Sequence, residues 1–275
     1  MKIVFLAIAM LSATGSFAQK DSKIKLTRGQ KITVMTNNSM DADMGMSMKN
    51  ASTTKNEIIV LDATADHYTV SNTITSMNLS LDMMGQQTTY DSNNAADRDS
   101  EMGKAVSQKI NKPDTLQLSA LTGALINNKK KTDAVDESAN PMSGMMEALG
   151  NNGDDLAVSN AFFIIPEGKK AGDSWSDSTT EKGMKIVKSY TLKSVEKDIA
   201  TINLTGKTDG TTETEMQGMQ LQININSKLN GEMQVNTNTS LVAKKTLTTD
   251  LTGSIEVMGQ STPITSKSTV TISYQ

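Results

Sequence analysis

Apolar and polar residues alternate along much of this chain. The clearest run places Met, Leu or Ile at the odd positions from 219 to 225 and Gln or Asn between them. Residues 77–83 repeat the pattern, with Met and Leu separated by Asn, Ser and Asp, and Val270, Ile272 and Tyr274 continue it. A period of two predicts strands with one dry and one wet face, and half-buried strands favour antiparallel over parallel sheet.

Turn-forming residues divide these stretches and predict several hairpins in series. The pairs and triplets that carry this signal are Asn37-Asn38, Lys55-Asn56, Glu196-Lys197-Asp198, Asp209-Gly210, Asn230-Gly231 and Asn236-Thr237-Asn238.

The middle of the chain has looser spacing and predicts two short helices. One is Glu101 to Asn111, which Lys112-Pro113 would end. The other is Pro141 to Leu149, with a capping Asn before it and Gly after it. Between them Thr122-Gly123 predicts a small hairpin, and the apolar run 162–166 is predicted to be core.

These patterns predict a mainly β (α+β) fold, namely a curved antiparallel sheet or half-barrel with short helices from a central insert. Met83-Met84-Gly85-Gln86 and Val257-Met258-Gly259-Gln260 each follow a period-two stretch, so two related β lobes are an alternative. We expect one β-rich domain over 19–275, comprising a first β region (19–96), a partly helical insert (97–160) and a second β region (161–275).

The N-terminus has the pattern of an export signal. Met1-Lys2 is a short positive region, Ile3 to Leu11 is apolar, and Ser16-Phe17-Ala18 is a cleavage site. We expect cleavage after Ala18, no later transmembrane segment, and release into a periplasm or the extracellular space.

Composition excludes several classes of function. Lys plus Arg number 27 and Asp plus Glu 30, for a net charge of -3, so no basic surplus favours a nucleic-acid partner. There is no Cys and only one His, so Cys-ligated and multi-histidine metal sites are excluded. The acidic stretch 91–101 lacks the Gly and Glu of an EF-hand loop and is expected to be a solvated loop. With no catalytic motif, we expect neither an enzyme nor a cofactor.

Methionine is the feature that bears on ligands, with 19 residues in the chain. Met44, Met46 and Met48 would share one strand face, where they fill apolar space or line an adaptable pocket. Thioethers also bind Cu(I), and Met40, Met142, Met145, Met146 and His67 could add to such a site. Trp175, the sole Trp, is expected to plug a sheet end, or alternatively to gate a cavity. Our candidate cavity residues are Met44, Met46, Met48, Met77, Leu79, Leu81, Met219, Leu221, Ile223 and Trp175.

Several segments resemble an uncharacterised family of secreted proteins from Bacteroidota. They are FIIPEGKKAGDSW (163–175), Tyr190-Thr191-Leu192, the 231–242 stretch, KLTRGQKITV (25–34) and Tyr90-Asp91-Ser92. The family has no known activity to transfer. Its β-rich layout is similar to the curved half-barrels of periplasmic lipoprotein carriers, although fold alone does not establish function.

We therefore expect an exported protein that binds a lipid, an acyl chain or another apolar ligand on a concave sheet face lined by Met, Leu and Ile. One alternative is a structural or interaction protein of the cell envelope that offers its edge strands to a partner. Methionine-based Cu(I) binding is a third hypothesis.

Overall fold

The described strands form one antiparallel sheet. The computed structural model of the chain describes residues 24–100, 103–104, 109–126, 157–181, 183–216, 219–257 and 259–275. Its twelve strands are β1 (Lys31–Asp43), β2 (Ser47–Ala63), β3 (His67–Met83), β4 (Gln86–Asp91), β5 (Pro113–Ser119), β6 (Leu125–Ile126), β7 (Ser174–Glu181), β8 (Met184–Glu196), β9 (Ile199–Met216), β10 (Met219–Asn236), β11 (Val242–Val257) and β12 (Gln260–Tyr274). The predicted curved antiparallel sheet is confirmed, and it is continuous rather than divided into two lobes.

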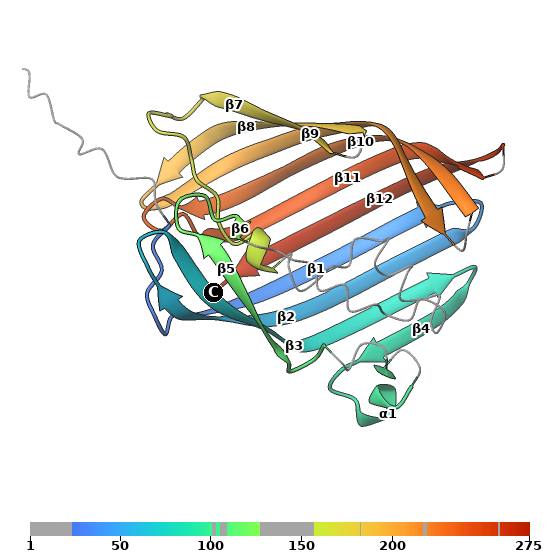
Figure 1. Cartoon of the computed structure of the whole chain (residues 1–275), viewed down its shortest axis with the longest axis horizontal. Coiled ribbons are helices and arrows are strands. Elements are labelled where there is room, and N and C mark those ends of the chain that lie inside the picture. Colours follow the sequence, from blue (N-terminus) through green and yellow to red (C-terminus); the bar gives the residue numbers. More distant parts are fainter. Residues whose placement is uncertain are drawn as a thin grey trace, which may run out of the picture.

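The sheet consists of two blocks of sequence-adjacent strands joined along one seam. Its order is β6-β5-β3-β2-β1-β12-β11-β10-β9-β8-β7. The strand β4 pairs with the C-terminal part of β3, beyond the part that pairs with β5. At the seam Val34 of β1 lies opposite Tyr274 of β12. Figure 1 shows the blue β1 beside the red β12 in the middle of the sheet.

Tight turns connect the long strands. Met84 and Gly85, with φ of 55° and 84°, form the two-residue turn from β3 to β4, which suits the twist of an antiparallel hairpin. The turn from β11 to β12 contains Gly259 with φ of 80° and also joins directly paired residues. The two similar tetrapeptides at 83–86 and 257–260 therefore both connect paired strands, and the predicted small hairpin at Thr122-Gly123 is confirmed as β5–β6.

Four of the predicted turns are wrong, because those residues lie inside strands. The four pairs are Asn37-Asn38, Lys55-Asn56, Asp209-Gly210 and Asn230-Gly231. The Asn side chains at 37 and 230 are on the exposed face of the sheet, where polar residues need no turn. Gly231 is required by close approach, since a Cβ there would collide with the Thr246 carbonyl oxygen and with Leu247.

The sheet curls so that distant strands share one hydrophobic core. Leu118 of β5 and Leu192 of β8, near opposite ends of the strand order, belong to the same buried cluster. This cluster defines the concave face of the sheet, and the curl is plain in Figure 1. Inward-facing glycines on β9, β10 and β11 remove side-chain bulk from the concave face.

Two segments outside the sheet close the core at one end. Ile24 and Leu26 precede β1, and residues 157–165 precede β7. The Tyr68 hydroxyl donates to the Ile24 carbonyl oxygen over 2.7 Å, which fixes the first segment to β3. Phe162 to Ile165 are half-buried against the same cluster, so the apolar run predicted as core does pack there.

Other predictions from the sequence fall outside the described residues. These are the export signal, the helix Pro141 to Leu149 and most of Glu101 to Asn111. In the described part, the short helix α1 (Ala95–Arg98) lies within the stretch expected to be a loop. Its start is fixed locally, because the Asn94 side chain accepts from the Ala96 amide.

Candidate functional site

The concave face carries an apolar strip on two central strands. The strip consists of Ile223, Ile225 and Leu229 of β10 with Leu247, Leu251 and Ile255 of β11, all half-buried. Leu229 and Leu247 contact the closed core, so the strip continues the core outward along the strands.

Small residues flank most of the strip. Gly231 lies opposite Leu247, Gly253 opposite Ile225, and Ser227 opposite Leu251. Ile225, Leu247 and Leu251 therefore lack an apolar partner of their own size across the β10–β11 pair, whereas Ile223 and Ile255 lie directly opposite each other. All of these side chains are only half-buried, so part of their surface is uncovered. An apolar molecule laid along these strands would cover it.

The first β region adds two buried clusters to the same face. Met48 and Leu81 pack with Ala42, and Met77 and Leu79 pack with Tyr90. Each of these four predicted cavity residues is at most 8% exposed. Their side chains are therefore packed in buried clusters and do not line an open cavity.

The methionine stretch 44–48 does not form one strand face. Met44 and Met46 lie in the turn between β1 and β2, where Gly45 has φ of 80°, and only Met48 is in a strand. Met44 packs beside the Met48 cluster, whereas Met46 is 43% exposed. The chain reverses there because Gly permits the positive φ that the turn requires.

The structure brings Met40, Met44, Met48 and Met83 into one cluster but excludes His67 from it. His67 begins β3 and Met83 ends it, so they are roughly 50 Å apart at 3.3 Å per residue. Among the described residues, no group of three or more His, Cys, Asp or Glu side chains could hold a metal ion. Met142, Met145 and Met146 lie outside the described part.

The remaining predicted residues are divided between the two ends of the concave face. Ile223 belongs to the apolar strip, whereas the side chains of Met219 and Leu221 lie outside the described part. Trp175 is at the closed end, stacked on Tyr190 with ring centroids 5.6 Å apart and 19° between the ring planes. Trp175 therefore lies where a plug over the end of the sheet would be, and it is not part of the apolar strip.

Two lysines face the concave side of the C-terminal block. Lys245 of β11 lies between Met233 and Ile272, both 2% exposed, and its Nζ donates to Asn160 Oδ1 over 2.8 Å. Burial of the ammonium and, to a smaller extent, the charge of Lys188 on β8 lower the pKa of Lys245 to about 8. Charged groups on this face were not predicted from the sequence.

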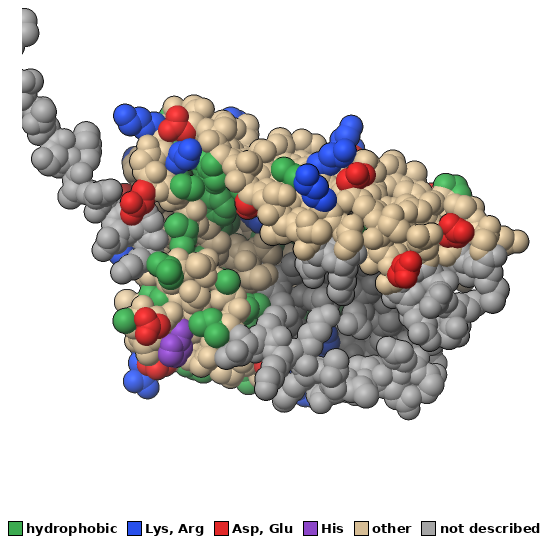
Figure 2. Space-filling view, turned by 45° about the horizontal axis from the view of Figure 1, so that its top comes forward, with side chains coloured by type: hydrophobic (Ala, Val, Ile, Leu, Met, Phe, Trp, Pro, Cys, Tyr) green, Lys and Arg blue, Asp and Glu red, His purple; other side chains and the backbone are tan. Residues whose placement is uncertain are grey.

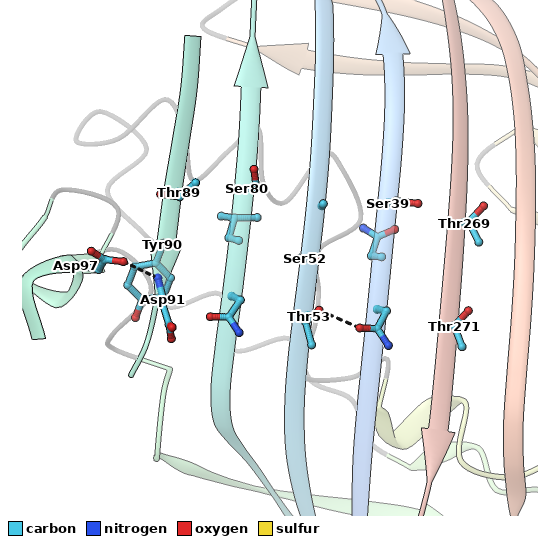
Figure 3. Close-up of a pocket in the computed structure, with 15 residues that line it drawn as sticks. Ser39, Ser52, Thr53, Ser80, Thr89, Tyr90, Asp91, Asp97, Thr269 and Thr271 are labelled. Atoms are coloured by element: carbon cyan, nitrogen blue, oxygen red, sulfur yellow. Dashed lines mark hydrogen bonds between the residues drawn. The ribbon is translucent and has the colours of Figure 1, made fainter. Parts of the chain in front are cut away.

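The opposite, convex face is polar throughout its middle. A groove of about 620 Å³ crosses β12, β1, β2, β3 and β4 there, lined by short side chains such as Asn37, Thr53, Ser80 and Thr271. Figure 3 shows Asp91 and Asp97 at one side of this groove, with Thr269 and Thr271 at the other. The Thr53 hydroxyl donates to Asn37 Oδ1 over 2.9 Å.

A ladder of alternating charges runs beside the groove on the convex face. Consecutive strands place opposite charges next to one another, in the order Lys228, Asp250, Lys267, Asp41, Lys49 and Asp82. Both Lys267–Asp250 and Lys49–Asp41 have N–O distances of 3.9 Å. In Figure 2 hydrophobic side chains gather at one end of the molecule, whereas tan surface with scattered charges covers much of the rest of the described surface.

The acidic stretch after β4 is used for local hydrogen bonding. Asp97 accepts from the Asp91 amide over 2.8 Å and from Asn94 Nδ2 over 3.0 Å. These bonds hold the turn into α1.

No helix of the described part is long and apolar enough to cross a membrane.

Together these features define a protein built on a single open sheet, with an apolar strip and buried clusters on its concave face and a polar groove on its convex face. A family model matches residues 65–242, from just before β3 to the first residue of β11. The chain therefore belongs to DUF6263, a family of unknown function. A search of curated protein sequences finds no match.

Solved structures provide a likeness of fold. Lipovitellin, in a structure concerned with lipid–protein interactions, matches with a TM-score of 0.50 and 8% identity. The match covers 91% of this chain but 25% of lipovitellin, so the chain spans a quarter of that protein. An outer membrane channel from Pseudomonas putida F1 also matches, at 8% identity, 92% and 97% coverage of the two chains and a TM-score of 0.25.

Proposed function

We propose that this protein binds the acyl chain of a lipid, or a similar apolar molecule, on the concave face of its sheet. The observation that carries the proposal is the half-buried apolar strip on β10 and β11, in which Gly231, Gly253 and Ser227 face three of the large side chains. An apolar chain against Leu229, Leu247 and Leu251 would bury surface that the sheet itself leaves half-exposed.

Two further observations support this proposal. The convex face offers short polar side chains and paired charges, so the concave face is the side suited to an apolar ligand. Lipovitellin, which has a similar curved sheet, is described by its interactions with lipid. The proposed role is binding without catalysis, in a protein exported by its N-terminal signal.

A neutral probe tests the apolar strip alone. Delipidated protein would be loaded with Nile red, which fluoresces in apolar surroundings, and hexadecanol would be added as competitor. Leu251→Asn should weaken hexadecanol binding about tenfold or more, because burying one Leu contributes roughly 1.5–3 kcal/mol.

The matched control is Thr252→Asn, which changes the next residue on the same strand, on the opposite face. This variant should bind hexadecanol like the unchanged protein. Equal affinity of both variants, or no displacement of Nile red by hexadecanol, would contradict acyl binding on this face. Native mass spectrometry of protein purified without detergent would identify any co-purified lipid by mass.

Export is tested separately by cell fractionation. We expect the full chain to appear in the periplasm or medium with residues 1–18 removed. A chain with Ala18→Leu should keep its signal, because a small residue is needed before the cleavage point. Retention of residues 1–18 on the unchanged, secreted protein would contradict this proposal.

A further inference from the structure

Positive charge on the concave face is not balanced by acidic residues in its central part. Across β1, β2, β3 and β8 to β12, the described concave positions include Lys188 and Lys245 and no Asp or Glu. On the convex face of these same strands, Lys49 and Lys267 are paired with Asp41 and Asp250. A ligand that reaches Lys245 on these strands therefore meets a positive field, whereas Lys188 has Asp177 opposite it on the edge strand β7.

Lys245 is positioned at the boundary between the closed core and the apolar strip. It follows Val242, which is 1% exposed, and precedes the half-buried Leu247 of the strip. Its cross-strand neighbours are apolar, and within the described part of the chain its Nζ donates to the neutral Asn160 amide oxygen. An ammonium offers three donors, so Lys245 retains capacity for a further acceptor.

The positive charge of Lys188 adds to the positive charge around Lys245. Its charge acts on Lys245 and disfavours a proton there. The cross-strand neighbour of Lys188 on the edge strand is Asp177, whose carboxylate accepts from the Tyr190 hydroxyl over 3.0 Å. Asp177 therefore lies on the edge strand β7 and accepts a hydrogen bond from Tyr190, while Lys245 lies four strands further in, on β11.

We infer that Lys245, assisted by Lys188, binds the carboxylate of a fatty acid whose chain lies along the apolar strip. The inference rests on the proposed acyl binding and specifies the head group of the ligand. A carboxylate has one negative charge, which matches the buried ammonium, and two oxygens that accept hydrogen bonds. From Lys245 to Leu251 the strand extends about 20 Å at 3.3 Å per residue, so head group and chain both have contacts.

The test compares palmitate with hexadecanol, which share a chain length and differ in head group. At neutral pH the protein should bind palmitate more tightly. Lys245→Met should weaken palmitate binding about ten- to a hundredfold, the range for losing a hydrogen bond to a charged group, and leave hexadecanol binding unchanged. Lys188→Met should cause a smaller loss of the same kind.

Lys244→Met is the matched control, because Lys244 is the adjacent residue on the exposed face of β11. It should bind both ligands like the unchanged protein. Carbon-13 NMR of carboxyl-labelled palmitate supplies a second readout, since a bound carboxylate near Lys245 should titrate at a lower pH than in the Lys245→Met protein. That signal separates a charge contact from a loss of folding.

The possible failures are distinguishable. If hexadecanol and palmitate bind equally, and Lys245→Met changes neither, acyl binding stands and the carboxylate site is wrong. If a lysophospholipid depends on Lys245 while palmitate does not, the head group is a phosphate and the assignment is overturned. If neither hexadecanol nor palmitate binds, the proposed function itself fails.

Discussion

The hydroxyl of Tyr274 donates to the carbonyl oxygen of Ala157 over 3.0 Å, joining the end of β12 to the segment that closes the core. Burial raises the pKa of this Tyr274 hydroxyl, so it remains a donor over the whole physiological range. The bond connects residues far apart in the sequence at a point where both are buried.

Tyr274→Phe should lower the free energy of unfolding by about 1–3 kcal/mol, because the Ala157 carbonyl would lose its buried partner. Tyr190→Phe is the comparison, since the Tyr190 hydroxyl donates to Asp177 in an exposed strand and its loss should cost less. Urea denaturation of the two variants measures the difference. Equal losses would argue that the Ala157 contact contributes nothing particular.

Gly231→Ala should be strongly destabilising, by about 1–3 kcal/mol, because the added methyl group overpacks a site bounded by the backbone. A Cβ at Gly206, by comparison, would have its nearest contacts at 3.3 Å, with the Leu229 side chain and the Val187 carbonyl oxygen. Gly206→Ala should therefore cost less. Thermal unfolding followed by circular dichroism would rank the two, and the reverse order would contradict the close-approach explanation.

Lys245 should make stability depend on pH above neutrality. Its pKa is lowered to about 8 in the folded protein, so the folded state binds fewer protons than the unfolded state between pH 8 and the usual lysine value of 10.5. Stability should therefore rise as pH increases through this window, at roughly 1.4 kcal/mol for each pKa unit of difference at most.

Lys245→Met should remove this rise, and Lys244→Met should keep it. Urea midpoints at pH 7, 8, 9 and 10 would measure the effect in all three proteins. A flat profile in the unchanged protein would mean that Lys245 is as well solvated when folded as when unfolded.

Lys267→Glu should destabilise the sheet by about 1 kcal/mol at low salt, because it places an acidic residue between Asp250 and Asp41. Lys267→Gln should have a smaller effect. The loss in Lys267→Glu should shrink in high salt, since exposed charges are screened. A loss that is unchanged by salt would point to packing rather than charge repulsion.

The sheet could be predicted because its strands keep a strict period of two, as at Met77 to Met83. The length of the strands could not, because Asn and Gly are usual turn residues and residues 37, 38, 230 and 231 carry that signal inside strands. The 18-residue β10 contains Gly231 because a Cβ there would collide with β11, and this close approach depends on a neighbouring strand that the local sequence does not reveal.

The candidate site was predicted only in part for a related reason. Ile223 follows an unbroken alternation and was found, whereas Leu247, Leu251 and Ile255 are separated on their face by Thr249 and Gly253. Lys245 reads as a surface residue because a neighbouring lysine, Lys244, precedes it. Only the register of β11 against β10 and β12 places the two lysines on opposite faces.

The seam between β1 and β12 has a consequence for how the chain folds. Val34 and Tyr274, which face one another there, are 240 positions apart, whereas most other strand pairs are neighbours in sequence. Hairpins on either side can form early from local contacts, but the seam must wait for both blocks. Until it closes, β1 and β12 both expose unpaired edges, so aggregation during refolding should compete most strongly at this one step.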